Sequence, residues 1–159
     1  MNGINILSTG EVGIGVTPTA RNNTVLQIKD GIGFPDTAVA STDAHTLDSY
    51  EEGTWTPTVA SMTEVGAATY SGYYTVIGDV MFFTVLIAPD TSTASTSNST
   101  TLTLPAGFSV ESISTTTWVS TGNNSMGTGF IHTATDKIYP PAWSANVNDI
   151  YGSGTCKID

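Results

Sequence analysis

The 159-residue sequence predicts an all-β protein. Ser, Thr, Asn and Gly supply most of its polar positions, and this composition favours strands and turns over helices. Three Trp, six Tyr and five Phe provide the large side chains that a folded core requires. From residue 54 onward, strand-like segments follow one another with turn signals roughly every 8 to 12 residues, which is typical of a β-sandwich with a jelly-roll-like arrangement.

Residues 1–34 form a glycine-rich segment that predicts a thin β structure in need of partners. In VGIGV, Val12, Ile14 and Val16 alternate with glycines, and alternation of period two indicates a strand. Glycine on the opposite face lets another backbone approach closely. Because so few large side chains cannot bury a core within one chain, we expect a short interwoven shaft in which several chains pool their apolar faces.

The rest of the chain divides into a connector, residues 35–53, and a compact head, residues 54–159. The connector has no clear hydrophobic period. In the head, DVMFFTVLIA at 79–88 is apolar on both faces, which predicts a central strand covered on both sides. The Gly78-Asp79 dipeptide before it predicts a β-hairpin. Residues 90–101 lack any large apolar side chain and predict a mobile loop or a solvated edge.

The charge balance excludes several classes of partner. The sequence has fourteen acidic and four basic residues, which gives a net charge of −10. Neither nucleic acid nor anionic lipid is expected to bind, because both require a basic surface. No apolar run reaches the ~20 residues of a membrane-spanning helix, so no membrane insertion is expected. The first ten residues lack the features of a signal peptide, which predicts synthesis in the cytoplasm.

No constellation of side chains predicts catalysis. His45 and His132 are the candidate bases, and neither lies in a nucleophile motif. Asp48, Glu51 and Glu52 are close in sequence, but adjacent residues on a strand point to opposite faces. We therefore expect no enzyme, no catalytic residue, no cofactor and no metal site. Solvated charges are the expected role of the three acids, with a divalent cation as the alternative.

Aromatic and amide side chains in the second half of the head are candidates for glycan binding. Aromatic rings stack on the C–H faces of sugars, and amides or hydroxyls bond to sugar hydroxyls. Trp143 lies in the predicted loop PPAWSANVN, and Trp118 lies in a Thr-rich segment. The alternative for each Trp is an aromatic of the core or of a subunit interface. The candidate set is Trp118, Asn123, Asn124, Trp143 and Asn146.

Several motifs resemble elements of bacteriophage fibre proteins. STGEVGIGVTPTA at 8–20 resembles the G-x-VGIG-T-x-P element that recurs in tail-fibre and spike proteins. LDSYEEGTWTPTV at 47–59 resembles the LDDYEEGTWTPT element that introduces a terminal β domain in many phage virion proteins. The hairpin segment at 70–87, TLTLPAGF at 101–108 and the closing segment at 148–159 are similar to later parts of that domain. The resemblance covers the chain from about residue 8 to its end.

The resemblance implies a homotrimeric, non-enzymatic protein on the exterior of a phage particle, such as a tail fibre, spike or head fibre. Its jelly-roll-like head would bind a host cell-surface receptor, and the aromatic candidates favour a polysaccharide. The N-terminal segment would dock on another virion protein. The alternative is a purely structural decoration or assembly protein of the capsid or tail, without receptor binding.

The resemblance also assigns roles to individual residues, and the sequence departs from the family's pattern at two positions. Val76 stands where the family often has Lys, and Cys156 stands where it often has an aromatic residue. The residues of the trimer shaft are Val12, Ile14 and Val16, and those of the shaft–head junction are Asp48, Tyr50, Glu51, Glu52 and Trp55.

Overall fold

The computed structural model describes residues 4–6, 12–14, 26–28, 50–89, 93–122, 124–146 and 148–159. Every regular element in these ranges is a β-strand, so the predicted all-β class is confirmed. Within the same ranges there is no helix that could cross a membrane. The chain divides into two compact units, Met1–Thr37 and Ala38–Asp159, and the second is called the head below.

The N-terminal unit contains a small three-stranded sheet. Its strands are β1 (Ile4–Ile6), β2 (Val12–Ile14) and β3 (Leu26–Ile28), with β2 antiparallel to β1 and parallel to β3. The strand predicted from VGIGV is thus present at β2, while Val16 lies outside the described residues. Directly opposed residues share a face of a sheet. The register aligns Ile4 with Ile14 and Ile6 with Val12, and it aligns Val12 with Leu26 and Ile14 with Ile28.

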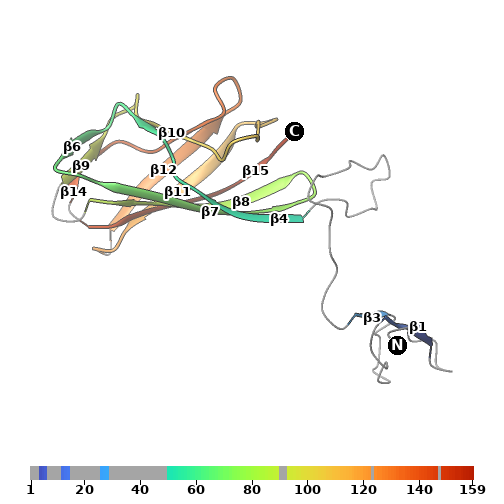
Figure 1. Cartoon of the computed structure of the whole chain (residues 1–159). Helices are drawn as coiled ribbons and strands as arrows, with labels where there is room; N and C mark the ends of the chain where they lie inside the picture. Colours follow the sequence, from blue (N-terminus) through green and yellow to red (C-terminus); the bar gives the residue numbers. More distant parts are fainter. Residues whose placement is uncertain are drawn as a thin grey trace. The chain divides into compact units, whose positions relative to one another are not determined.

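The head contains one large sheet and one small sheet (Figure 1). The large sheet has nine strands, all paired antiparallel, in the order β4-β7-β8-β15-β11-β12-β13-β10-β5. The small sheet has the order β14-β9-β6 and lies at one end of the head (Figure 1). The strands are β4 (Tyr50–Trp55), β5 (Val59–Ala60), β6 (Thr63–Val65), β7 (Thr69–Ile77), β8 (Val80–Ala88), β9 (Thr93–Thr96), β10 (Thr101–Thr103), β11 (Ser114–Ser120), β12 (Asn124–His132), β13 (Lys137–Tyr139), β14 (Trp143–Asn146) and β15 (Ile150–Lys157).

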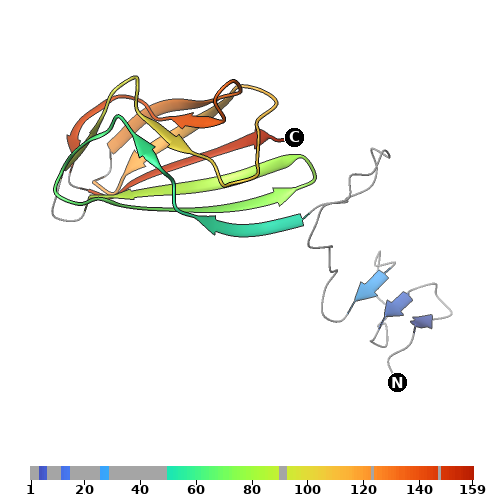
Figure 2. The same cartoon turned by 45° about the horizontal axis from the view of Figure 1, so that its top comes forward.

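The large sheet is curled because its two edge strands follow each other in the chain. β4 and β5 stand at opposite edges, yet only residues 56–58 separate them. Four residue steps span at most about 14 Å, so the edges have to approach each other. The Trp55 indole Nε1 donates a hydrogen bond to the Thr103 carbonyl at 3.0 Å, which ties the end of β4 to β10. Figure 2 shows the sheet bending round the core.

The hairpin and the central strand predicted from the sequence are both present. β7 and β8 pair along their whole lengths around the Gly78-Asp79 turn, in which Gly78 has φ +58°. β8 lies between β7 and β15, and its inward side chains, including Met81 and Phe83, are buried. Its outward Phe82 remains 47% exposed. Within one chain β8 is therefore covered on one face, since the curled sheet encloses its core on a single side.

Aromatic rings lying over glycines of the neighbouring strand organise the core. A Cβ at Gly72 would lie 2.3 Å from the Trp55 ring, and a Cβ at Gly152 would lie 2.7 Å from the Trp118 ring. Only glycine leaves room for a ring to lie flat against the adjacent strand. In each case the two residues are directly opposed in the register. The pairs are Trp55–Gly72, Tyr74–Gly53, Phe83–Gly154 and Trp118–Gly152.

Two segments are more ordered than the sequence predicts. The prediction of a loop or solvated edge at 90–101 is wrong for β9, which is the middle strand of the small sheet. Small polar side chains of this segment are buried because their hydroxyls bond to backbone carbonyls. Thr96 Oγ1 on β9 donates to Pro141 O at 2.6 Å, and Thr100 Oγ1, after the strand, donates to Ser61 O at 2.7 Å. Trp143 lies on β14 rather than in a loop. The first strand of the head begins at Tyr50.

Replacing Gly72 by Ala should destabilise the head by about 1–3 kcal/mol, because the new methyl group collides with the Trp55 ring. An unhindered Gly→Ala change in a strand would instead stabilise slightly. Urea unfolding followed by tryptophan fluorescence measures the difference. Gly122→Ala is the control, since its methyl group meets the side-chain ends of Asn148 and Ser120 rather than an aromatic ring. Equal stability of Gly72→Ala and the unmodified protein would contradict the packing described above.

Candidate functional site

The outer face of the curled sheet carries a row of exposed hydroxyl side chains. Consecutive members are directly opposed on neighbouring strands, so the row runs across the strands rather than along any one of them. All of its members are exposed. One residue comes from each of β4, β7, β8, β15, β11 and β12, and in that order they are Thr54, Tyr73, Thr84, Ser153, Thr117 and Thr128. This run of residues is called the hydroxyl row below.

A groove of about 660 Å³ lies over the middle of the hydroxyl row. Tyr73, Thr84, Ser153 and Thr117 line it together with residues of the next row, which contains Phe82. Tyr73 is 62% exposed and Phe82 is 47% exposed, and the two rings form the aromatic border of the groove. The other members of the hydroxyl row that line the groove have small side chains. The volume of the groove is in the range of ligand-binding sites in proteins.

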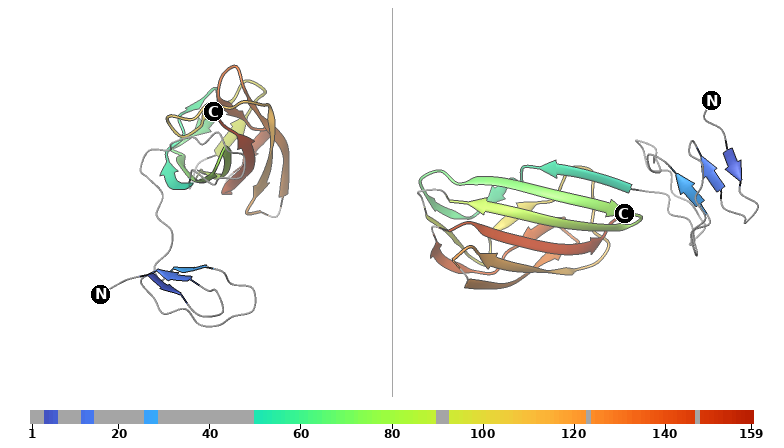
Figure 3. Two further views of the ribbon diagram at one scale, coloured as in Figure 1. Left: turned by 90° about the vertical axis from the view of Figure 1, so that its right-hand side faces the viewer. Right: turned by 90° about the horizontal axis from the view of Figure 1, so that it is seen from below.

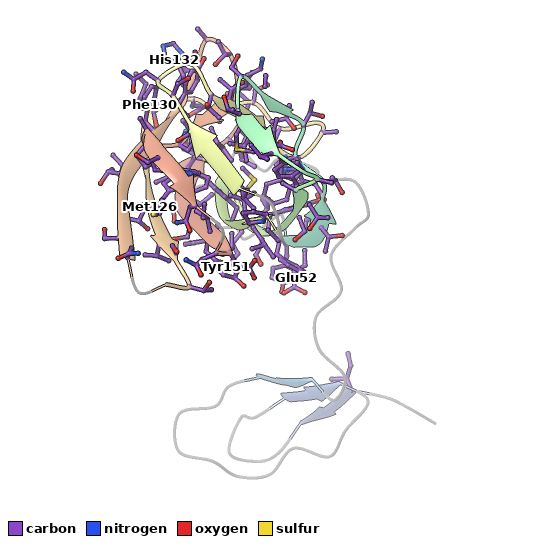
Figure 4. The ribbon with its side chains drawn as sticks, turned by 90° about the vertical axis from the view of Figure 1, so that its left-hand side faces the viewer. Glu52, Met126, Phe130, His132 and Tyr151 are labelled. Carbon is purple, nitrogen blue, oxygen red and sulfur yellow. The ribbon has the colours of Figure 1, made fainter. Side chains whose placement is uncertain are left out.

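The groove is uncharged. None of its lining residues is acidic or basic. Two charged residues lie on the outer face beside the groove. They are Glu52 on β4 and Lys157 on β15. The Lys157 ammonium pairs with Glu111, and its Nζ lies 3.8 Å from Asp79 Oδ2. Figure 3 (right) shows β4, β7, β8 and β15 side by side, and Figure 4 shows Glu52 and Tyr151 on the same side of the head.

The arrangement suits recognition of a neutral polar ligand. Thr117 Oγ1 and Ser153 Oγ form a hydrogen bond of 3.1 Å across two strands, which orients both hydroxyls. A hydroxyl can both donate and accept, as sugar hydroxyls do. Exposed aromatic faces beside hydroxyls therefore match the mixed polar and apolar surface of a carbohydrate. The same residues offer neither a base nor a nucleophile activated by one.

The acidic residues of the junction do not form one cluster. Glu51 and Glu52 lie on β4 and point to opposite faces, as their adjacency predicts. Glu52 accepts a hydrogen bond from the Tyr50 hydroxyl, and Glu51 Oε1 accepts one from the Tyr74 hydroxyl at 2.5 Å. Asp48 lies outside the described residues. Among the described residues no three acidic, His or Cys side chains are grouped so that they could hold a metal ion.

The glycan-contact candidates chosen from the sequence do not come together on the surface. Trp118 is 1% exposed, so it cannot stack on a sugar, and its prediction as a receptor contact is wrong. Its indole fills the core over Gly152 and donates to Thr116 Oγ1 at 2.9 Å. Trp143 is half-buried, with its ring centroid 5.8 Å from that of Trp118.

The described amides among these candidates differ in exposure. Asn146 is half-buried, and its Oδ1 accepts hydrogen bonds from the backbone and side chain of Asn148 at 2.9 Å and 3.1 Å. Asn124 is exposed at the start of β12. Asn123 lies outside the described residues. With Trp118 in the core and Trp143 half-buried, the described candidates do not form the exposed aromatic surface that the sequence predicted.

The residues of the groove are ones that the sequence did not single out. Thr115 and Thr117 alternate with buried Thr116 and Trp118, and this pattern indicated which side chains of β11 face outward. Nothing in the sequence gave the register, however, and only the register aligns Thr117 with Ser153 and Thr84. The two apolar faces of β8 predicted coverage on both sides, and the exposure of Phe82 is therefore a finding of the structure alone.

The single cysteine has a structural position. Cys156 is buried on β15, opposite Met81, and burial raises the pKa of its thiol to about 11. A thiol with so high a pKa is protonated at neutral pH and is a poor nucleophile. The small Cys156 side chain is thus accommodated in the core.

Comparisons of the chain with protein-family models, curated proteins and solved structures found no match.

Exchanging Glu51 for Gln should lower the pKa of Tyr74. The hydrogen bond to the Glu51 carboxylate is the main reason why this pKa is raised to about 12, with burial second. Because the folded-state pKa is raised, the pair's contribution to stability is fully present below about pH 10 and is lost as the pH rises through about 12.

Tyrosinate absorbance during an alkaline titration measures this change. One tyrosine of Glu51→Gln should ionise at lower pH than in the unmodified protein, and adding Tyr74→Phe should remove that ionisation. Glu52→Gln is the comparison variant: it should lower the pKa of Tyr50 instead, because Glu52 accepts from Tyr50, and adding Tyr74→Phe should leave that ionisation in place. An unchanged titration of Glu51→Gln would show that the carboxylate does not hold the phenol proton.

Proposed function

We propose that the chain is a bacteriophage virion protein, a tail fibre, spike or head fibre on the exterior of the particle, whose head binds a polysaccharide of the host cell surface. The resemblance of residues 8–20 and 47–59 to phage fibre elements supports the class of protein. The uncharged groove bordered by Tyr73 and Phe82 carries the receptor-binding part. No catalytic step belongs to the proposal.

Homotrimer formation is part of the proposal and is supported by the N-terminal sheet. The sheet consists of three strands of three residues each, and Ile4 on its edge strand is 69% exposed. So small a sheet cannot bury an apolar face by itself. Copies of the same sheet around an axis would cover it and form the interwoven shaft, which then docks on another virion protein.

A jelly-roll-like β-sandwich is the finer fold that we propose for the head. Support comes from the curl of the nine-stranded sheet, which brings strands from its two halves to opposite sides of one core (Figure 3, left). Such a domain presents a broad strand face to solvent, as an attachment protein needs. The outer face of β7, β8, β15 and β11 is the part of that surface where aromatic and hydroxyl side chains combine.

A purely structural role in the capsid or tail is the second candidate, and one observation favours it. The same outer face also exposes Ile77 by 42%, Val119 by 51% and Tyr50 by 42%. Exposed apolar residues on a strand face can be covered by another subunit. In that case the head would serve assembly, and the groove would close when the particle forms.

The full-length chain should have three times its 16.5 kDa mass in native mass spectrometry, and it should bind polysaccharides on a microbial glycan array. A monomer at micromolar concentration would contradict the trimeric shaft. A trimer that binds nothing on the array would contradict the attachment function and favour the structural role.

A further inference from the structure

We infer that the ligand of the groove is a neutral, extended polysaccharide that lies across the strands along the hydroxyl row, a conclusion that rests on the proposed attachment function. The inference specifies the class of receptor, the residues that contact it and the direction in which it runs. It depends on the register of five strand pairs, the absence of charge in the groove and its aromatic border.

The direction of the ligand follows from the register. Thr54 and Thr128 end the hydroxyl row five strand spacings apart, an arc of roughly 24 Å at the usual spacing of about 4.8 Å. Hydroxyls at such regular intervals match a repeating chain of sugar units better than one compact ligand. Along β8, by contrast, Thr84 lies between the apolar outward residues Phe82 and Leu86.

The absence of charge selects a neutral polymer. An anionic polysaccharide needs Lys or Arg, and none lines the groove. Lys157 on the same face of β15 is held by Glu111 and Asp79, and Glu52 on β4 would repel an anion at the other margin. The chain's net charge of −10 adds to this repulsion. The polar interactions that the groove can offer are therefore hydrogen bonds between its uncharged hydroxyls and those of a sugar.

The border of the groove supplies the apolar contact. Tyr73 and Phe82 stand on adjacent strands and are exposed, so each offers a ring to a passing sugar. Inward rings beneath them hold these strands: Phe83 packs over Gly154, and Tyr74 packs over Gly53. The groove is thus built on a rigid section of the sheet, which limits the entropy lost on binding.

Binding to immobilised dextran, mannan and galactan, each compared with its sulfated form, tests the class of ligand. The full-length protein is measured by biolayer interferometry. At least one neutral polymer should bind more tightly than its sulfated form. Preference for the sulfated forms would overturn the assignment of a neutral ligand. Absence of binding to every polymer would contradict the attachment function and the inference together.

Thr84→Val with Thr117→Val tests the hydroxyl row on any polymer that binds. Valine keeps the shape and the strand preference but removes two hydroxyls, so affinity should fall roughly tenfold or more. The conservative pair Thr84→Ser with Thr117→Ser should retain binding. Thr63→Val, on exposed β6 away from the groove, is the matched control. Unchanged affinity of the double valine variant would overturn the inference while leaving the attachment function in place.

The same face could instead be covered by a second copy, and Phe82→Asp separates the two cases. For a ligand groove the variant should keep the native mass of the unmodified protein and lose polysaccharide binding. A reduction of that mass would identify the face as a subunit interface and overturn the inference. Val65→Asp is the control, because Val65 is 66% exposed on the small sheet outside the groove.

Discussion

Residues 56–58 join strands that stand at opposite edges of the nine-stranded sheet, and this short connection constrains the rest of the head. An open sheet with its edges far apart is impossible when the chain must cross between them in about 14 Å. The hydrogen bonds of Trp55 Nε1 to Thr103 O and of Thr58 N to Thr103 Oγ1, each 3.0 Å, hold the closure at that point. Curling then gives the sheet one enclosed face and one face in contact with solvent, and the candidate groove lies on the latter.

The pairing of aromatic rings with glycines shows how the enclosed face is filled. A sheet curled round a single core has little room between its halves, and a ring that lies over a glycine occupies less depth than one that stands beside another side chain. Glycines elsewhere in a strand weaken it, but here the opposed ring covers the exposed backbone. On β11 Thr116 and Trp118 point inward and are buried, and the outward Thr115 and Thr117 keep strand preference while remaining polar.

Tyrosine hydroxyls serve as partners for carboxylates in a chain that has few cations. Glu51 accepts from Tyr74, Glu52 from Tyr50 and Glu64 from Tyr70. A phenol donates a hydrogen bond without neutralising the charge, so the surface of the head stays acidic while these side chains remain ordered. The acidic pair at the start of β4 is therefore explained by strand alternation and two separate tyrosine partners.

By itself the sequence determined the all-β class, the β7–β8 hairpin, the central place of β8 and the opposite orientations of Glu51 and Glu52. These features depend on local composition, on period-two alternation and on a two-residue turn. Only the tertiary structure decided that Trp118 is a core residue, that β9 and β14 are strands, and that Thr84, Ser153 and Thr117 align. Strand register and sheet order depend on contacts between residues far apart in the chain, and alternation within one strand carries no information about which strand lies beside it.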